Sequence, residues 1–598
     1  MHKGLERYAY ILLASRLALY LVSRAIYVPF VNDESETFLF FIQTGDFVPW
    51  ISSHWVANNH FLNTMLSWIS YQFFGLDEWT LRLASLFSFV LFLVYLYKTG
   101  LLVKHRVLRW ILWLSILGAH YFIEFFAYCR GYAMSNAFLL AAIYHLIKAC
   151  KKPGRLSGEM WLSFLFMTAA LLANLNLLYS YAIWLTFAYV LTQSPPPKRD
   201  PSLLFWAALV PLCYSLTIAV KLKIHDQLYI GTPYGMESSY KIILEAILPG
   251  FVIPALYYFY FIGILALLLV GYYFYRSRTQ WSDSLPLNVF LIFISVNLLI
   301  SFGTAVLMGL KLPIARTGSY WYMLAVITLV LVLDRVKNES WGRFFWVTAI
   351  PLLFIPLNFV RLANLHVSSD KAWASEQIPE AFYNYLVQRD TSSSFPSTLS
   401  AGSSFYSHNW AMLNLQKKRD VNVCQNYVGR EMISDYQIIK TEDFPSFAGT
   451  YVENISDRYS GLSVISRYKP MSRQTILEAD SPVFENDNPS FYQIMQCRVD
   501  SLQGLPLQFD YTVDQHTKES LFTGLLTVIF KNARDEHIAY EQVNISHHKT
   551  EWGKEPLRVS IYFDRVPLEA ISVESYIWNF NEQKYSLLQA HVSMHLLK

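Results

Sequence analysis

The chain has 598 residues, of which 54% are hydrophobic and only 15% are charged, and its mean hydropathy is +0.27. Soluble globular chains carry about 25% charged residues, so this composition excludes an ordinary soluble protein and indicates a polytopic membrane protein. The formal net charge of +4 is too small to predict a nucleic-acid partner.

Apolar segments of the length needed to cross a bilayer recur through residues 1–363. We predict about eleven spans, near 8–28, 79–101, 107–125, 131–148, 159–176, 178–194, 201–220, 250–275, 285–309, 318–334 and 344–361. The first segment contains Arg16 and Arg24 and lacks a small-residue cleavage site, so we interpret it as a retained span. A charge in the middle of a span should face the bundle interior, and we expect this of Arg16.

Basic residues cluster in alternate loops. The clusters are Lys98/Lys104/Arg106/Arg109, Lys148/Lys151/Lys152/Arg155, Lys198/Arg199, Arg276/Arg278 and Arg335/Lys337/Arg343. All of them fall on the cytoplasmic side if the N-terminus is cytoplasmic, as the positive-inside rule requires. The uncharged stretch 161–193 must then cross the membrane twice, as two short helices that turn near Asn174–Asn176.

The loop at residues 29–78, after the first span, is acidic and faces outward in this topology. Its acidic residues are Asp33, Glu34, Glu36, Asp46, Asp77 and Glu78, and no Lys or Arg occurs between Ala25 and Leu81. Asp33-x-x-Glu36 fits a capping box, and Gly45 is placed to end that helix. A second helix is predicted from Asn59 to Gly75, and nearby Trp residues indicate that both helices lie at the membrane interface.

Several cations break the rule that outward loops are poor in Lys and Arg. They are Arg130, Lys221, Lys223, Lys311 and Arg316. Because the planar guanidinium of Arg donates two parallel hydrogen bonds to a phosphate, these cations could hold an anionic lipid phosphate. The reactive sugar carbon of such a lipid would then lie near Asp33.

Each of these residues also has a plainer interpretation. Asp33 could be only a helix N-cap, and Glu34 could be a solvated or capping residue. His60 could be a satisfied interfacial histidine, and the outward cations could extend to lipid headgroups. Asp33, Glu34 and His60 could ligate a divalent metal, but we favour a site without metal or other cofactor.

A series of short motifs in the first third of the chain resembles a known family. The motifs are Asp33-Glu34, Gly45-Asp46, Asn58-Asn59-His60-Phe61-Leu62-Asn63, Phe74-Gly75 and Leu81-Arg82-Leu83. They resemble the first external loop and second span of GT-C glycosyltransferases, in the branch of protein O-mannosyltransferases and lipid A aminoarabinose transferases. The segment from Glu124 to Tyr132 resembles the start of their fourth span. Arg316 and Tyr320 are similar to the basic and aromatic positions before a late span.

The resemblance implies that Asp33 is the general base and that the donor is a polyprenyl-phosphate sugar. The predicted substrate-binding residues are Glu34, His60, Arg130, Tyr132, Lys221, Lys311, Arg316 and Tyr320. The chain departs from the family where Phe61-Leu62 follows His60, because a proline is usual there. An acceptor oxygen that attacks in line inverts the sugar carbon; a carboxylate must take its proton, and fixed positive charge must stabilise the leaving phosphate.

After about residue 364 the composition becomes that of a soluble chain. We predict an α/β subdomain at 364–490 and, from short strand-like segments, a β-sandwich at 491–598. The sandwich could bind a glycan, dock an acceptor or brace the membrane domain. Cys424 and Cys497 could form a disulfide if this region is extracytoplasmic, and His547 and His548 are expected in a solvated loop.

The predicted fold is therefore a GT-C-like polytopic α-helical membrane domain followed by a soluble extracytoplasmic α/β plus β-sandwich region. We predict an inverting hexosyl- or pentosyltransferase in a bacterial inner membrane, with a cytoplasmic N-terminus and a periplasmic C-terminal region. Its partners would be the bilayer, a polyprenyl-phosphate sugar donor and a lipid, glycan or protein acceptor. The alternatives are a transporter or flippase of a lipid-linked glycan and a glycan ligase or polymerase.

Overall fold

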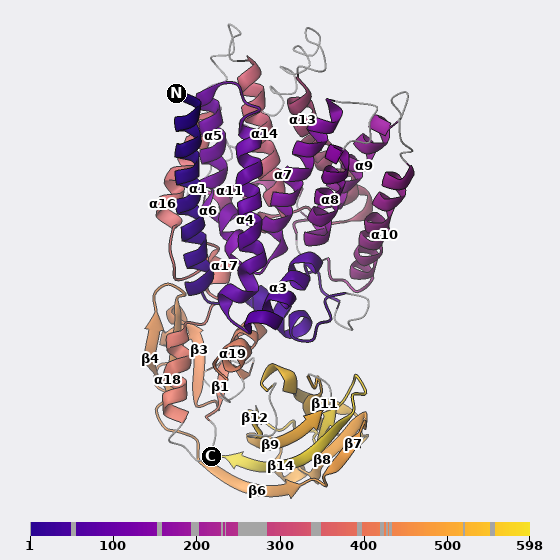
Figure 1. Ribbon diagram of the computed structural model, residues 1–598. Helices are drawn as coiled ribbons and strands as arrows, with labels where there is room; N and C mark the ends of the chain where they lie inside the picture. The colour runs from indigo at the N-terminus through magenta and orange to yellow at the C-terminus, as the bar shows by residue number, and fades with distance from the viewer. Residues whose placement is uncertain are drawn as a thin grey trace. The chain divides into compact units, whose positions relative to one another are not determined.

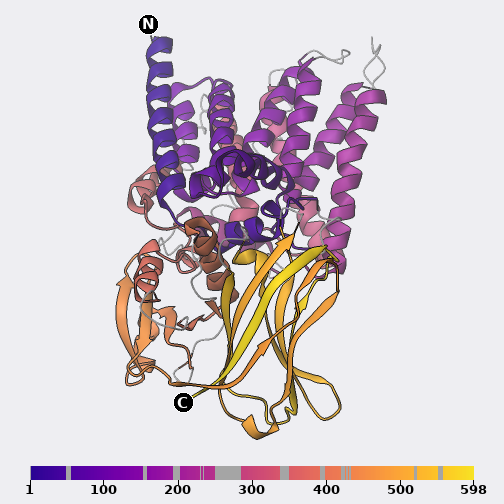
Figure 2. The same ribbon diagram turned by 60° about the horizontal axis from the view of Figure 1, so that its bottom comes forward.

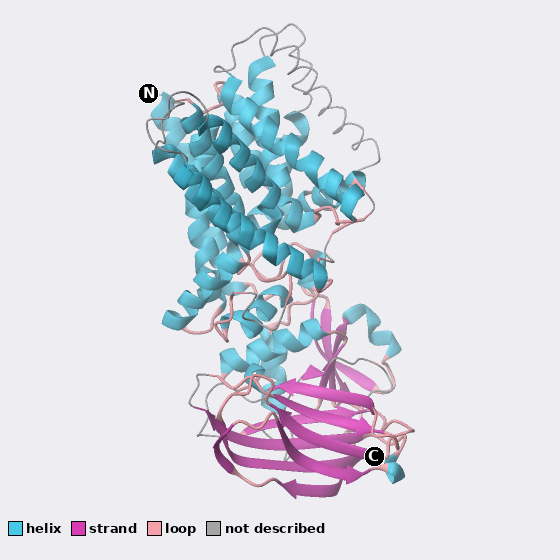
Figure 3. Cartoon of the chain, turned by 90° about the vertical axis from the view of Figure 1, so that its right-hand side faces the viewer, coloured by secondary structure: helices cyan, strands magenta, loops and turns pink. Residues whose placement is uncertain are grey.

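A computed structural model describes most of the chain. The described residues are 2–48, 55–151, 158–192, 202–228, 231–233, 235–248, 284–336, 349–390, 397–418, 424–425, 429, 433–517, 521–549 and 556–598. They form two compact units: the helical unit, Met1–Val28 with Phe40–Asp370, and the mixed unit, Pro29–Leu39 with Lys371–Lys598. Figures 1 and 3 show helices throughout the first unit and strands only in the second. The predicted span at 250–275 lies outside the described residues.

The helical unit consists of long apolar helices joined by short ones. Its α-helices are α1 (His2–Tyr27), α3 (Phe61–Phe74), α4 (Glu78–Gly100), α5 (Arg106–Leu117), α6 (His120–Glu124), α7 (Gly131–Cys150), α8 (Gly158–Ala173), α9 (Leu178–Thr192), α10 (Ser202–Ile224), α11 (Met236–Ile247), α13 (Leu285–Met308), α14 (Ser319–Val336) and α16 (Ile350–Leu362). Six helices among the described residues are long and apolar enough to cross a membrane, or seven if the bent pair 106–117 and 120–127 is one span. Three shorter apolar helices accompany them, at Gly158–Ala173, Leu175–Leu191 and Leu352–Leu362.

Two local predictions for this unit are confirmed. The uncharged stretch 161–193 forms α8 and α9, which are separated at Asn174 by a 3-10 turn at Leu175–Leu177. The side-chain oxygen of Asn174 accepts a hydrogen bond from the backbone N–H of Asn176 at 3.1 Å, which stabilises the break. Helix α3 ends at Gly75, whose φ of 78° is a conformation that glycine adopts without strain.

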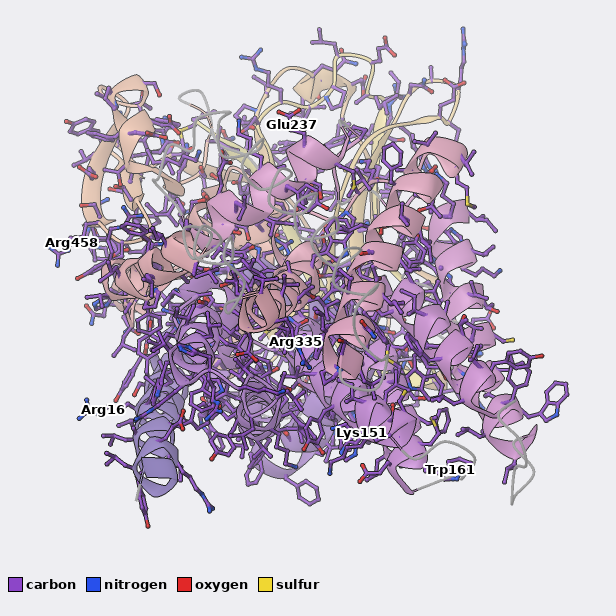
Figure 4. The ribbon with its side chains drawn as sticks, turned by 90° about the horizontal axis from the view of Figure 1, so that it is seen from above. Arg16, Lys151, Trp161, Glu237, Arg335 and Arg458 are labelled. Atoms are coloured by element: carbon purple, nitrogen blue, oxygen red, sulfur yellow. The ribbon has the colours of Figure 1, made fainter. Side chains whose placement is uncertain are left out.

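The prediction that Arg16 faces the bundle interior is wrong. The side chain is exposed on the outer face of α1, together with Leu12 and Leu19. Figure 4 shows it pointing away from the neighbouring helices. The physical reason is the long apolar stem of arginine, which lets a charge on an apolar face extend toward the lipid headgroups.

A buried ionic network connects α1, α6 and the segment after α16. Arg24 is 1% exposed and donates to Glu124 Oε2 and the Tyr128 hydroxyl, both at 3.0 Å, and to the Asn364 carbonyl at 2.6 Å. Ser369 donates its hydroxyl to Glu124 Oε1 at 2.5 Å and its backbone N–H to Oε2 at 3.1 Å. A buried charge is tolerated only when it is paired and hydrogen-bonded, so this network fixes the last residues of the helical unit.

The mixed unit begins with a five-stranded sheet in the order β2-β1-β3-β5-β4. Its strands are β1 (Leu399–Ala401), β2 (Cys424–Gln425), β3 (Tyr436–Lys440), β4 (Tyr451–Asp457) and β5 (Leu462–Arg467), with helices α17 (Lys371–Ala374), α18 (Glu380–Asp390) and α19 (Ser404–Lys417). Strand β1 pairs in parallel with both neighbours, while β3, β5 and β4 pair antiparallel. Trp410 of α19 and Phe382 of α18 pack in the core of this part.

The rest of the mixed unit is a sandwich of two antiparallel sheets (Figure 2). Its strands are β6 (Arg473–Asp480), β7 (Phe484–Asp487), β8 (Phe491–Arg498), β9 (Leu507–Thr517), β10 (Leu525–Lys531), β11 (His537–Asn544), β12 (Leu557–Phe563), β13 (Ser572–Trp578) and β14 (Tyr585–Leu597). The sheets run β11-β10-β13-β8 and β12-β9-β14-β6, with β7 beside β14. Side chains alternate along each strand, so every second residue enters the shared core.

For the mixed unit, the disulfide that the sequence left open is not formed, and one prediction is wrong. Cys424 and Cys497 are both free thiols; Cys424 is buried in the core of the five-stranded sheet, and Cys497 packs against the sandwich core. His547 is buried in a 3-10 turn after β11 instead of lying in a solvated loop. Burial lowers the pKa of the neighbouring His548 to about 4.

Candidate functional site

A cavity of about 240 Å³ lies within the helical unit, between the segment that precedes α3 and helices α7, α8, α10, α13 and α14. Its apolar wall includes Leu171, Leu172, Leu175, Leu178, Ile218 and Leu222. Its polar lining includes His60, Tyr132, Asn174, Tyr179, Ser301, Lys311, Thr317 and Tyr320. The cavity therefore combines a polar part with a long apolar surface, as a site for a lipid with a polar headgroup requires.

Four of the nine residues singled out in the sequence line this cavity: His60, Tyr132, Lys311 and Tyr320. They come from segments up to 260 positions apart, and helix packing brings them together. Tyr132 and Tyr320 are buried, whereas Lys311 is exposed and contributes a charge to the lining. The rings of His60 and Tyr132 meet edge to face, with centroids 4.5 Å apart.

Gly131 allows the close packing that positions His60. A Cβ atom at Gly131 would overlap the carbonyl oxygen of Ala173 and come within 2.9 Å of the His60 Cβ. Only glycine lets the first turn of α7 approach these groups so closely. In the space that glycine leaves, Ala173 O lies 2.9 Å from His60 Nδ1.

This contact determines the tautomer of His60. A carbonyl oxygen can only accept, so His60 Nδ1 carries the proton and donates, and Nε2 keeps its lone pair. His60 is 6% exposed, and Nε2 has no hydrogen-bond partner within the part of the chain that the structure describes. Burial lowers the pKa of His60 well below 6.5, and the positive charges of Arg130 and Arg316 lower it further. The imidazole is therefore neutral with an unprotonated Nε2, in a residue that lines the cavity.

Arg130 is buried and holds the segment before His60. It is 1% exposed, and it donates to the backbone carbonyl of Asn58 at 3.0 Å and to the side-chain oxygen of the same residue. Its guanidinium also lies 5.7 Å from the ring centre of Tyr132. The alternative that Arg130 extends to lipid headgroups is therefore wrong. It positions the His60 segment and is not one of the cavity-lining residues.

The segment Lys311–Thr317 forms another wall of the cavity. Leu312 exchanges two backbone hydrogen bonds of 3.0 Å with Thr232, and Arg316 lies in the 3-10 turn Ala315–Gly318 that precedes α14. Helix α11 supports this turn, because Ser239 donates its hydroxyl to the Pro313 carbonyl. Lys221, in contrast, is exposed on α10 and does not line the cavity, although Ile218 and Leu222 of the same helix do.

Asp33 and Glu34 lie in α2 (Asn32–Thr37), which belongs to the mixed unit. The predicted capping box at Asp33 is wrong, because the helix starts two residues earlier, with Val31 as its N-cap. Glu34 is fully buried, and its Oε2 accepts the Val31 backbone N–H at 3.2 Å. Asp33 occupies the second helical position and is half-buried, so the N-cap alternative for this carboxylate does not hold.

Helix α2 is attached to α19 by side-chain hydrogen bonds. The Ser35 hydroxyl donates to Asn409 Oδ1 at 2.5 Å, and Asn409 in turn donates to the Glu376 carbonyl at 2.7 Å. His408 Nδ1 lies 3.1 Å from Asn32 Oδ1. The residues on both sides of Asp33 are therefore held by hydrogen bonds within the mixed unit.

Sequence reasoning missed the contribution of α13. Asn297, Ser301 and Thr304 lie at spacings of four and three on a very apolar helix, so they share one face. Ser301 and Thr304 line the cavity, and Thr304 is hydrogen-bonded to the Tyr179 hydroxyl at 2.9 Å. Hydroxyl and amide groups on one face of an otherwise apolar span were the signal that could have identified this wall.

Solved structures of ArnT and of AftD are similar to this chain at low sequence identity. ArnT from Cupriavidus metallidurans bound to undecaprenyl phosphate has a TM-score of 0.43 and 10% identity, over 77% of this chain and 97% of its own. The apo state of ArnT has a TM-score of 0.41 and 12% identity, over 76% and 97%. Arabinofuranosyltransferase AftD from Mycobacteria has a TM-score of 0.37 and 9% identity, over 98% of this chain and 61% of its own.

The sequence matches no protein-family model and no curated protein. The roles of residues are therefore argued from this chain's own contacts.

Replacing Gly131 by alanine should disrupt the site. The added methyl group collides with Ala173 and His60, so we expect thermal unfolding in detergent to show a loss of about 1–3 kcal/mol, as overpacked cores do. Gly303→Ala is the matched control, because a Cβ at Gly303 in α13 meets no atom within 4 Å. Equal stability of the two variants would refute the close approach at Gly131.

The tautomer of His60 can be observed directly. In protein labelled with ¹⁵N-histidine, we expect His60 to show a protonated Nδ1 and an unprotonated Nε2 at pH 7, with no titration between pH 8 and pH 6.5. A pKa well below 6.5 keeps the ring neutral over this range. His60→Phe assigns the signal by removing it. A neutral ring protonated only on Nε2 would contradict the hydrogen bond to Ala173, and an imidazolium at pH 7 would contradict the lowered pKa.

Proposed function

We propose that this protein is an inverting membrane glycosyltransferase that transfers a sugar from a polyprenyl-phosphate donor to an acceptor at the extracytoplasmic face of a bacterial inner membrane. The observation that carries the proposal is the cavity of the helical unit. It combines an extended apolar wall, a cation at Lys311 and a neutral hydrogen-bond acceptor at His60. The apolar wall suits a lipid tail, the cation suits a phosphate, and the hydrogen-bond acceptor suits a sugar hydroxyl.

The cations and His60 have different tasks in this proposal. Lys311 and Arg316 supply positive charge to the donor phosphate, and they stabilise it further when it leaves. His60 Nε2 carries a lone pair and no charge, so it repels phosphate oxygens and accepts a hydrogen bond from a hydroxyl group instead. The sugar therefore lies on the His60 side of the cavity, and the phosphate lies on the side of the Lys311–Thr317 segment.

The proposed reaction is a single displacement. The acceptor hydroxyl oxygen attacks the anomeric carbon and forms the new glycosidic bond, while the bond from that carbon to the phosphate oxygen breaks. The Asp33 carboxylate takes the acceptor proton, and the polyprenyl phosphate leaves with the electron pair. Attack opposite to the leaving group inverts the anomeric carbon. Glu34 is the weaker candidate for a substrate contact, because its carboxylate already caps α2.

Asp33→Asn should abolish transfer while leaving the fold intact. General-base catalysis typically contributes about 10²–10⁴-fold, and we expect a loss of this size in kcat with donor affinity unchanged. The matched control is Glu36→Gln, which makes the same chemical change three residues later in α2. Transfer assays with extracted lipid-linked sugars and thermal unfolding of both variants test this. Near-normal transfer by Asp33→Asn would remove Asp33 from the mechanism.

Arg316→Ala should weaken binding of the donor phosphate. Hydrogen bonds to charged groups contribute about 1.5–3 kcal/mol, so we expect affinity for undecaprenyl phosphate, used as the probe, to fall about 10- to 100-fold. Neither Arg316 nor Lys221 is one of the lining residues, but the charge of Arg316 acts on His60 in the cavity wall. Lys221, in contrast, is exposed on α10, so Lys221→Ala is the control. Equal affinities of the two variants would argue against the phosphate role of Arg316.

A further inference from the structure

One face of the sandwich carries aromatic side chains that its core does not use. In β8 and β13, Ile494, Val573 and Ile577 point into the core, and residues on the opposite side of these strands point outward. Two of the outward residues, Phe491 and Trp578, are register partners on the two strands and are 62% and 36% exposed. Exposed apolar rings gathered on one surface indicate a binding function.

These rings form one contiguous group, which we call the aromatic face: Phe491, Tyr576, Trp578 and Phe580. The rings of Phe491 and Trp578 are nearly parallel, with an interplanar angle of 10° and centroids 5.9 Å apart. Tyr576 meets Phe491 edge to face at 5.6 Å, and Phe580 meets Trp578 at 5.9 Å. Mutual contact holds the rings in place before any ligand arrives, which reduces the entropic cost of binding.

Polar side chains continue the same face along the strands. Gln493 donates to Gln496 at 3.0 Å, and Gln496 donates to Glu574 Oε1 at 2.8 Å. Gln493 is the register partner of Tyr576, and Gln496 is that of Glu574. Amide and carboxylate groups therefore lie close to the rings. Alternate residues on one face of a strand are about 6.6 Å apart, and the polar groups lie one or two such intervals from the rings.

The charges on this face are neutralised within it. Lys531 pairs with Glu574 Oε2 at 2.8 Å, and Arg498 pairs with Asp500 at 3.3 Å. Binding to acidic lipids or to nucleic acid needs cations that are available to phosphate groups, and these two cations are already paired. Lys531 also pairs with Asp535 at 3.2 Å, so the face offers aromatic rings and hydrogen-bonding groups while both of these cations are bound by carboxylates.

The opposite sheet of the sandwich has a different use. Its strand β12 joins the five-stranded sheet, because the Gln425 side chain donates to the Tyr562 carbonyl and accepts the Tyr562 N–H, at 3.3 and 3.1 Å. Arg473 of β6 also pairs with Asp435 at 2.9 Å. Contacts between the two parts of the mixed unit therefore use the β12-β9-β14-β6 sheet, and the aromatic face remains exposed on the other sheet.

We propose that the aromatic face binds a neutral oligosaccharide. One side of a pyranose or furanose ring presents C–H groups, which pack on the faces of aromatic rings, while its edge presents hydroxyl groups that both donate and accept. The Phe491–Trp578 pair fits the C–H side, and the amides of Gln493 and Gln496 with the Glu574 carboxylate fit the hydroxyl edge. The assignment stands on the surface of the sandwich alone and does not depend on the reaction proposed for the helical unit.

The test uses the full chain in detergent micelles, titrated by calorimetry with six-residue mannan, glucan, galactan and arabinan oligosaccharides. We expect at least one of these probes to bind, Trp578→Ala and Phe491→Ala each to weaken it at least tenfold, and Trp578→Phe to retain most of the affinity. Tyr468→Ala is the matched control, because Tyr468 is a 68% exposed aromatic residue of the mixed unit outside this face. Asp33→Asn should bind the probe like the unmodified chain.

Thermal unfolding checks that the variants fold. We expect them to fold, because the side chains of Phe491 and Trp578 are exposed. The proposal is overturned if none of the four probes binds, if Trp578→Ala and Phe491→Ala bind as well as Tyr468→Ala, or if Asp33→Asn binds more weakly. It is also overturned if these variants lose only binding to vesicles of phosphatidylglycerol and phosphatidylethanolamine. None of these results bears on transfer by the helical unit, which the Asp33→Asn assay tests separately.

Discussion

The hydrogen bond between Ser35 and Asn409 is the contact on which the proposed mechanism depends most directly. It joins α2, which carries Asp33, to α19 of the C-terminal region across 374 positions of sequence. Asn409 is 3% exposed and also binds the Glu376 carbonyl, so its orientation is fixed from two directions. A catalytic carboxylate must be held in place by groups whose own conformation is locked. The C-terminal region therefore orients α2, the helix that carries the proposed base.

The helical unit meets the same requirement by different means. His60 is oriented through a backbone carbonyl that only a glycine at position 131 allows to come close, and Arg130 next to that glycine fixes Asn58, two residues before His60. One dipeptide at the start of α7 thus sets both the position and the tautomer of the acceptor. Loss of the packing at Gly131 would alter the direction of the Nε2 lone pair as well as the volume of the cavity.

Sequence reasoning succeeded where local physical rules decide the structure. Long apolar segments, the break at Asn174 and the helix end at Gly75 follow from hydropathy, from side-chain hydrogen bonding and from the backbone freedom of glycine. It failed where the outcome depends on contacts distant in sequence. Arg24 appeared only as a charge in the first apolar segment, because its partner Glu124 lies 100 positions away. Nothing local could show that Lys221 would be exposed while Lys311 lines the cavity.

The failure at the capping box is the most instructive for the site. The pattern of Asp33 followed three residues later by Glu36 predicts a capping box with Asp33 as N-cap, but the N-cap in the structure is Val31, two residues earlier. Because of this shift, Glu34 turns back to bind the N-cap N–H, and Asp33 occupies the second helical position. The register of this six-residue helix thus gives two adjacent carboxylates different places: Glu34 caps the helix, and Asp33 is a half-buried residue of its first turn.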